Sequence, residues 1–144
     1  MSYVDKSLLP GEVVAYRTHL HRILFFWPVV LGLAALGLAF ASPPSGGALL
    51  VIALVLAVRA YVHYVSCEFA VTNKRVVIKV GLVRRRTLEM LLSKVEAISV
   101  DQTLLGRLLG YGTIVVVGTG GTQEPFERIA GPLEFRRAVQ AATP

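Results

Sequence analysis

Hydrophobic residues form one long block in this chain, whereas elsewhere they alternate with polar residues over short distances. Residues 23–41 (ILFFWPVVLGLAALGLAFA) contain no charged side chain, and residues 48–65 (ALLVIALVLAVRAYVHYV) are nearly as apolar. About 20 helical residues, each rising about 1.5 Å, cross a hydrocarbon core of about 30 Å. The block therefore predicts a transmembrane helical hairpin, because a helix pair in a soluble protein would offer a polar face to water.

Residues 42–47 (SPPSGG) predict the turn between the two helices, because proline and glycine do not continue a helix. Ala39-Phe40-Ala41 has the A-x-A form of a signal-peptide cleavage site. The segment before the block is nonetheless long and contains acidic residues, and the apolar run exceeds the usual length of about 7–15 residues. We therefore expect the hairpin to be retained uncleaved.

Positive charge predicts the orientation of the hairpin. The turn carries no Lys or Arg, whereas Arg17 and Arg22 precede the hairpin and further basic residues follow it. By the positive-inside rule both termini are cytoplasmic, which makes the chain a multi-pass protein of the cytoplasmic membrane. Aromatic residues at 25–27, 61 and 64 would share one membrane interface, where such rings prefer to lie.

Two polar residues interrupt the second apolar segment. Arg59 and His63 are four residues apart and so share a helix face. Intramembrane charges often serve ion or proton paths. Alternatively, Arg59 lies close enough to the end of the segment for its long side chain to reach the cytoplasmic headgroups.

Beyond residue 65 the pattern changes to short runs that are typical of β-strands. The runs predict strands at residues 68–72, 75–80, 84–92, 95–100, 113–117 and 125–129. Residues 104–109 (LLGRLL) predict a short helical turn that ends at Gly110, and an amphipathic helix begins near Pro132. Residues 12–21 are compatible with one more strand before the hairpin. The pattern favours a small antiparallel sheet capped by a C-terminal helix.

Several of these runs also carry a resemblance to a known family. They are Glu68–Arg75 (EFAVTNKR), Gly81-Leu82, Arg85-Arg86-Thr87, Ser93–Glu96 (SKVE), Gln102–Gly112 (QTLLGRLLGYG), Phe135-Arg136-Arg137 and, before the hairpin, Pro10-Gly11-Glu12. Together they resemble the bacterial pleckstrin-homology-like (PH-like) membrane proteins, and residues 102–112 are the most specific part. The resemblance implies a bent antiparallel sheet, or two packed sheets, closed by the C-terminal helix. That fold normally has seven strands, so the segment before the hairpin would supply the missing one.

The expected fold class is a membrane α+β protein, with a two-helix transmembrane hairpin and a PH-like antiparallel β domain that ends in a helix. We expect a cytoplasmic N-terminal segment at residues 1–22 and the hairpin at residues 23–65. The cytoplasmic PH-like domain then occupies residues 66–144.

Composition agrees with a membrane protein. The chain of 144 residues is 54% hydrophobic, its net charge is +6 and its mean hydropathy is +0.62. In a membrane protein a net positive charge reflects the topology of the chain and its attraction to anionic headgroups. We therefore expect membrane lipids as partners and no nucleic acid. Cys67 is the only cysteine, which excludes an intrachain disulfide and a cysteine zinc cluster.

Candidate chemistry is sparse. The histidines His19 and His21 have no Cys or carboxylate at metal-ligand spacing, so we expect no metal. The glycines at 118–121 are not followed by a helix and predict a turn rather than a dinucleotide loop. No Ser or Cys has an assignable base. We therefore expect no catalytic residue, no cofactor and no enzyme activity.

The basic residues of the β domain fall into two groups. A strand that leaves the membrane near residue 66 and ends at residue 72 runs about 20 Å, at about 3.3 Å per residue. Lys74 and Arg75 would then lie far from the bilayer, where they could contact a partner. The next strand returns, which brings Arg84, Arg85 and Arg86 to the headgroups, with Arg84 and Arg86 on one strand face. Solvated surface residues that only set topology are the simpler alternative.

The leading functional hypothesis is a membrane-anchored PH-like binding or scaffold module with anionic-lipid contact. Small residues in the hairpin and exposed sheet edges permit self-association, so we expect a homo-oligomer or a membrane protein partner. The alternative is a subunit of an oligomeric transporter or channel, in which Arg59 and His63 face a pore. The missing catalytic residues argue against a membrane enzyme.

Overall fold

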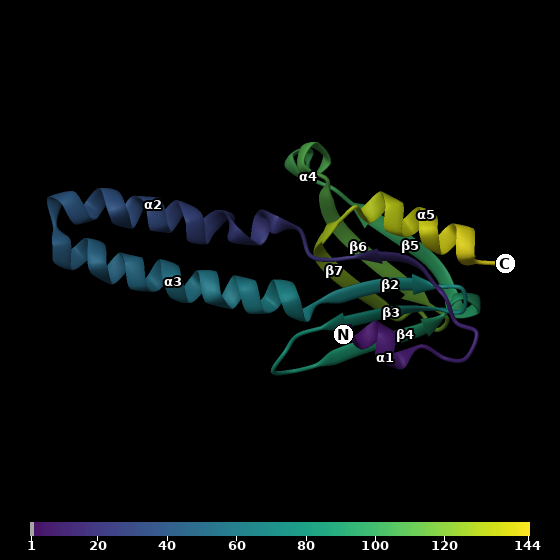
Figure 1. Ribbon diagram of the computed structural model, residues 1–144. Helices are drawn as coiled ribbons and strands as arrows, with labels where there is room; N and C mark the ends of the chain where they lie inside the picture. Colours follow the sequence, from purple (N-terminus) through teal and green to yellow (C-terminus); the bar gives the residue numbers. More distant parts are fainter. Residues whose placement is uncertain (1) are drawn as a thin grey trace. The chain divides into compact units, whose positions relative to one another are not determined.

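A computed structural model describes residues 2–144 of the chain, and the chain divides into two compact units (Figure 1). One unit is the helical hairpin, Arg22–Val65. The other, called the β domain here, combines the chain up to His21 with Ser66–Pro144. The β domain is therefore assembled from two pieces of chain that the hairpin separates.

The β domain contains two antiparallel sheets and the helix α5. The four-stranded sheet has the order β1 (Val14–Thr18), β2 (Glu68–Thr72), β3 (Arg75–Val80), β4 (Arg86–Leu91). The three-stranded sheet has the order β5 (Val95–Asp101), β6 (Tyr111–Gly118), β7 (Gln123–Ala130). A 3-10 turn, Leu92–Lys94, joins the two sheets, and the remaining helices of this unit are α1 (Tyr3–Ser7), α4 (Leu104–Leu109) and α5 (Pro132–Ala142).

The seventh strand of the PH-like fold comes from the segment before the hairpin. β1 pairs antiparallel with β2, and Thr18 lies opposite Phe69. The chain therefore leaves the sheet after β1, forms the hairpin, and returns directly into β2. One expected strand is shorter than its pattern suggested, because β4 begins at Arg86 and residues 82–84 form a bend instead.

The core of the β domain lies where the two sheets and α5 meet. Phe69 of β2 contacts Phe126 of β7 edge to face, with ring centroids 5.9 Å apart. Phe135 of α5 is fully buried and contacts Tyr16 of β1 in the same way. Aromatic pairs of this kind stabilise a core beyond their buried area by about 0.5–1.5 kcal/mol each.

The helix α1 covers the outer face of the four-stranded sheet, and sequence reasoning did not find it. Its Val4 is buried and forms one cluster with Ala70 of β2 and Val77 of β3. The sequence did contain a sign that this face is covered, because β2 and β3 contain unbroken apolar runs rather than alternating ones. Such runs are typical of strands that are buried on both faces.

The hairpin consists of α2 (Phe26–Ala41), preceded by a 3-10 turn at Arg22–Phe25, and α3 (Pro43–Ser66). The expected six-residue turn at 42–47 is wrong, because α3 already begins at Pro43. Proline is well suited to the first turn of a helix, where its missing N–H would have no partner inside the helix. At Gly46 a Cβ would lie 2.4 Å from the Ala39 Cα, so the two helices approach too closely for any larger residue.

Both hairpin helices are long and apolar enough to cross a membrane, over Arg22–Ala41 and Pro43–Ser66. Only 11% and 6% of their most apolar windows are buried inside the protein. A core helix of a soluble protein would be mostly buried, so these helices do not pack as core helices do.

Candidate functional site

The described residues, 2–144, contain no group of three or more His, Cys, Asp or Glu side chains that could hold a metal ion. His19 and His21 instead tie β1 to the three-stranded sheet. The His19 carbonyl accepts a hydrogen bond from the Ala130 N–H at 2.9 Å, and the His21 ring lies 5.2 Å from the Tyr111 ring. Neither histidine therefore belongs to a metal site among the described residues.

One end of the β domain carries both links to the hairpin, after His21 and before Ser66, and we call it the hairpin end. β3 runs back toward this end, because Glu68 at the start of β2 lies opposite Lys79 near the end of β3. The β3–β4 connection, residues 81–85, is therefore at the hairpin end, and Arg86 follows it at the start of β4. The expected headgroup contact of Arg84, Arg85 and Arg86 stays a prediction. Turning here requires Gly81, whose φ is +88° and whose added Cβ would lie 2.5 Å from the Arg84 carbonyl oxygen.

The β3–β4 connection exposes both apolar and basic side chains. Leu82 is 53% exposed and Val83 is 99% exposed. Arg84 and Arg85 are also exposed and precede β4, so the expectation that Arg84 and Arg86 share one strand face does not apply. Arg86 starts the strand, and its guanidinium forms an ion pair with Glu124 of β7 at 2.6 Å.

The opposite end, called the far end, carries Lys74 and Arg75. Arg75 was expected to contact a partner, but its side chain is only 12% exposed and is occupied within the domain. Its Nε donates to Glu12 at 2.9 Å, Nη1 pairs with Glu89 at 2.5 Å, and Nη2 donates to the Ser7 carbonyl at 2.5 Å. Lys74 remains exposed and donates from Nζ to the Pro10 carbonyl at 3.2 Å. Of the two, only Lys74 is exposed.

Glu12 is the centre of this network and holds the N-terminal segment on the sheet. Its carboxylate accepts from Arg75, from the Thr72 hydroxyl at 2.7 Å and from the Leu9 N–H at 2.8 Å. Burial alone would raise the pKa of Glu12, but these donors outweigh it and lower the pKa to about 2. Sequence reasoning missed this role, because Glu12 and Arg75 lie far apart in the chain.

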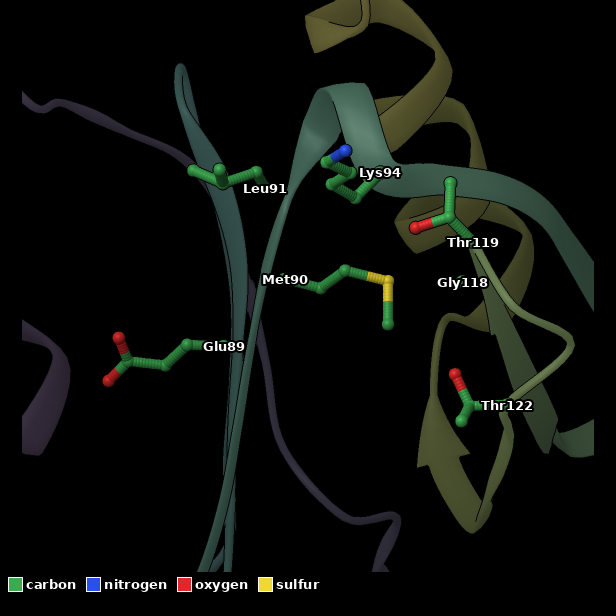
Figure 2. A pocket seen from close by; sticks show the side chains of 7 residues that line it. All are labelled: Glu89, Met90, Leu91, Lys94, Gly118, Thr119 and Thr122. Carbon is green, nitrogen blue, oxygen red and sulfur yellow. The ribbon is translucent and has the colours of Figure 1, made fainter.

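A hollow of about 270 Å³ lies between β4 and the β6–β7 turn (Figure 2). Figure 2 shows Met90 pointing into it, with Thr119 and Thr122 across from Met90 and Glu89 pointing away. The hollow is open to solvent, and the charged residues among its lining are Glu89 and Lys94. The Met90 methyl group reaches toward Gly118, where an added Cβ would lie 2.7 Å from it.

Cys67 is buried, with 1% of its surface exposed. Burial raises the pKa of its thiol, although a hydrogen bond with the Gly81 backbone opposes the shift. A buried thiol with a raised pKa is a poor nucleophile, so Cys67 is a structural residue beside the β3–β4 connection.

Arg59 and His63 lie one turn apart on α3 and both are exposed on the hairpin surface. They belong to the second half of the helix, toward the link with the β domain.

One comparison with known proteins, the match to a family model, identifies the family of this chain. Residues 25–143 match the family model described as the bacterial PH domain. A solved structure of a DUF1696 family protein with a pleckstrin-homology domain, from Shewanella loihica PV-4, is similar with a TM-score of 0.45 and 9% identity. That similarity covers 56% of this chain and 74% of the other. None of the curated proteins matches this chain. The match over most of the chain confirms the resemblance, and the chain belongs to the bacterial PH domain family.

Proposed function

We propose that this protein is a membrane-anchored binding or scaffold module, which presents its PH-like β domain at the cytoplasmic surface of the cell membrane. The observation that best supports this proposal is that two apolar helices are inserted between β1 and β2 of one domain. Because β1 and β2 pair, both links to the hairpin must emerge on the same side of the membrane. The family supports a binding role in general, and the insertion supports the anchor.

Charge supports the cytoplasmic side. The links to the hairpin are flanked by Arg17 and Arg22 before it and by the basic β domain after it, whereas α2 and the start of α3 carry no charge. Positive loops stay in the cytoplasm. The same charges favour anionic headgroups, and Arg84 and Arg85 would each contribute about 1 kcal/mol near such a surface. Arg86 would contribute less, because it is paired with Glu124.

We also propose that the module associates with itself or with a membrane protein partner. The edge strand β4 offers unpaired backbone groups, and Lys74 at the far end offers a charge. Mass measurement in mild detergent, across a wide concentration range, tests self-association. A monodisperse monomer throughout would contradict it.

Membrane extraction tests the anchor. The full chain should resist alkaline carbonate and be released only by detergent, as an integral protein is. Arg59→Leu should leave both extraction and oligomeric mass unchanged, because a scaffold does not use this side chain for transport. Release by carbonate alone would overturn the proposal, and ion flux through reconstituted protein that Arg59→Leu abolishes would favour a channel subunit instead.

A further inference from the structure

The outward surface of α4 is apolar and exposed. This six-residue helix exposes Leu104 by 78%, Leu105 by 64%, Leu108 by 78% and Leu109 by 50%. Its buried residue is Gly106, where an added Cβ would lie 2.6 Å from the Tyr111 carbonyl oxygen. The helix therefore turns glycine inward and leucine outward, which is the reverse of a helix that packs on a core.

The conformation of α4 is held at both ends. At its start the Thr103 hydroxyl accepts from the Gly106 N–H at 3.1 Å. At its end Gly110 takes the left-handed conformation, with φ +81°, and donates to the Gly106 carbonyl at 2.8 Å. The Gly110 carbonyl in turn accepts from the Gly131 N–H at 3.0 Å. The outward leucines thus belong to a capped element that is fixed to the sheet.

The helix α4 lies at the hairpin end of the β domain. It leads into β6 at Tyr111, whose ring lies 5.2 Å from that of His21, the last residue before the hairpin. Tyr111 also lies opposite Ala130, whose carbonyl accepts a hydrogen bond from the Thr18 hydroxyl at the end of β1. His21, the last β-domain residue before the hairpin, therefore lies beside the residue that follows α4 and Gly110.

A second apolar tip lies at the same end. The β3–β4 connection exposes Leu82 and Val83 and continues into Arg84 and Arg85. In α4 the leucines likewise surround an exposed Arg107. Figure 1 shows α4 and the β3–β4 connection along one side of the β domain, the side where β1 ends and β2 begins. Two separate connections thus combine aliphatic side chains with arginine.

We propose that α4 and the β3–β4 connection enter the interfacial region of the bilayer that holds the hairpin. The leucines and Val83 would lie among the upper acyl chains, and the arginines at the level of the phosphates. This inference rests on the proposed function, because it requires the hairpin to be in the membrane. A lipid surface fits better than a protein partner, since α4 carries no aromatic anchor and is too short to fill a groove.

Site-directed fluorescence on the full chain in liposomes tests the proposal. In a Cys67→Ala background, single variants Leu108→Cys, Val83→Cys, Thr119→Cys and Val55→Cys receive an environment-sensitive dye. Thr119 is the matched exposed control on the β6–β7 turn, and Val55 reports the middle of α3. Because Leu108 and Val83 are mostly exposed, their replacement removes no core contact.

We expect lipid that carries a shallow nitroxide to quench the dyes at Leu108 and Val83 severalfold more than the dye at Thr119. A Leu108 dye as accessible to aqueous iodide as that at Thr119, with Val55 quenched by deep nitroxide, would overturn the inference and leave the anchor standing. Failure of deep nitroxide to quench Val55 would overturn the anchor itself. A Leu108 dye shielded from iodide but not quenched by lipid would mean a protein contact, which would also overturn the inference.

Discussion

Thr18 and Phe69 lie opposite each other on neighbouring strands, although both apolar helices lie between them in the chain. This pairing constrains the topology independently of the charge pattern. A sheet that includes both residues can form only if the chain crosses the membrane an even number of times.

The first prediction is that the tip of the hairpin is extracellular and uncleaved. In the Cys67→Ala background, a membrane-impermeant thiol reagent should label Ser45→Cys in intact cells and label Thr119→Cys only after lysis. Intact mass should include the residues before the hairpin. A mature chain that begins at Ser42 would contradict this prediction.

The second prediction concerns the buried pair of Glu12 and Arg75. Glu12→Gln should lower the free energy of unfolding of the β domain by about 3 kcal/mol, because it leaves a buried guanidinium without its main partner. Denaturant unfolding of the detergent-solubilised protein, followed by the β-sheet signal, measures the change. Lys74→Gln is the neighbouring exposed control and should change stability by no more than about 0.5 kcal/mol. Equal effects of the two variants would show that the network does not hold the N-terminal segment.

The third prediction is a pH dependence that originates at Glu12. Its pKa is about 2 in the folded domain, against an ordinary value of 4.5. A lowered pKa stabilises the fold above pH 4.5, and this stabilisation is lost as the pH falls from about 4.5 to about 2. Unfolding measured at a series of pH values should show this loss, and Glu12→Gln should flatten the curve over that window. If the free energy of unfolding of the variant falls with pH as steeply as that of the unchanged protein, other carboxylates cause the acid sensitivity.

The fourth prediction is that the β domain needs its N-terminal piece but not the hairpin. A short glycine-serine linker in place of Arg22–Val65 should give a soluble protein with cooperative thermal unfolding and a dispersed NMR spectrum. The fragment 66–144 alone should not fold, because it lacks β1 and α1 and so exposes both faces and the edge of β2. A dispersed spectrum from the fragment would contradict this reasoning.

The fifth prediction separates the arginines of the hairpin end. In the linker variant, the double change Arg84→Gln and Arg85→Gln should weaken cosedimentation with anionic liposomes about thirtyfold, at about 1 kcal/mol per arginine. Arg86→Gln should have less effect, because Glu124 already pairs with Arg86. Lys74→Gln at the far end is the control, and added salt should reduce every difference. A dominant effect of Lys74 would mean that the far end faces the lipid.

The features that sequence reasoning predicted are local ones. The apolar length of the hairpin and the β-branched run at residues 113–117 (TIVVV) determine their elements without help from distant residues. The helix α1 was missed because its five residues are too few to display a helical period. The start of α3 was misplaced because proline breaks a helix interior but favours a helix start.

In the candidate site, too, the sequence predicted the local features but not those that depend on tertiary contacts. The basic character of residues 84–86 is visible in the sequence, as is the return of β3 that carries them to the hairpin end. The burial of Arg75 is not visible in the sequence, because its partner Glu12 is distant in the chain and meets Arg75 only in the folded domain. The six residues of α4 predicted a helical turn, but nothing in their pattern showed that the leucines point away from the core.

The insertion of the hairpin between β1 and β2 also sets the order in which the protein can be made. The ribosome releases α1 and β1 first, and at about 5–20 residues per second several seconds pass before β2 follows. During this interval β1 lacks β2, the strand with which it pairs. Under the proposed anchor, both helices enter the membrane in the same interval. A chain whose two links emerge on opposite sides of the membrane cannot close the four-stranded sheet. Closure of the four-stranded sheet therefore waits until the whole hairpin has been synthesised.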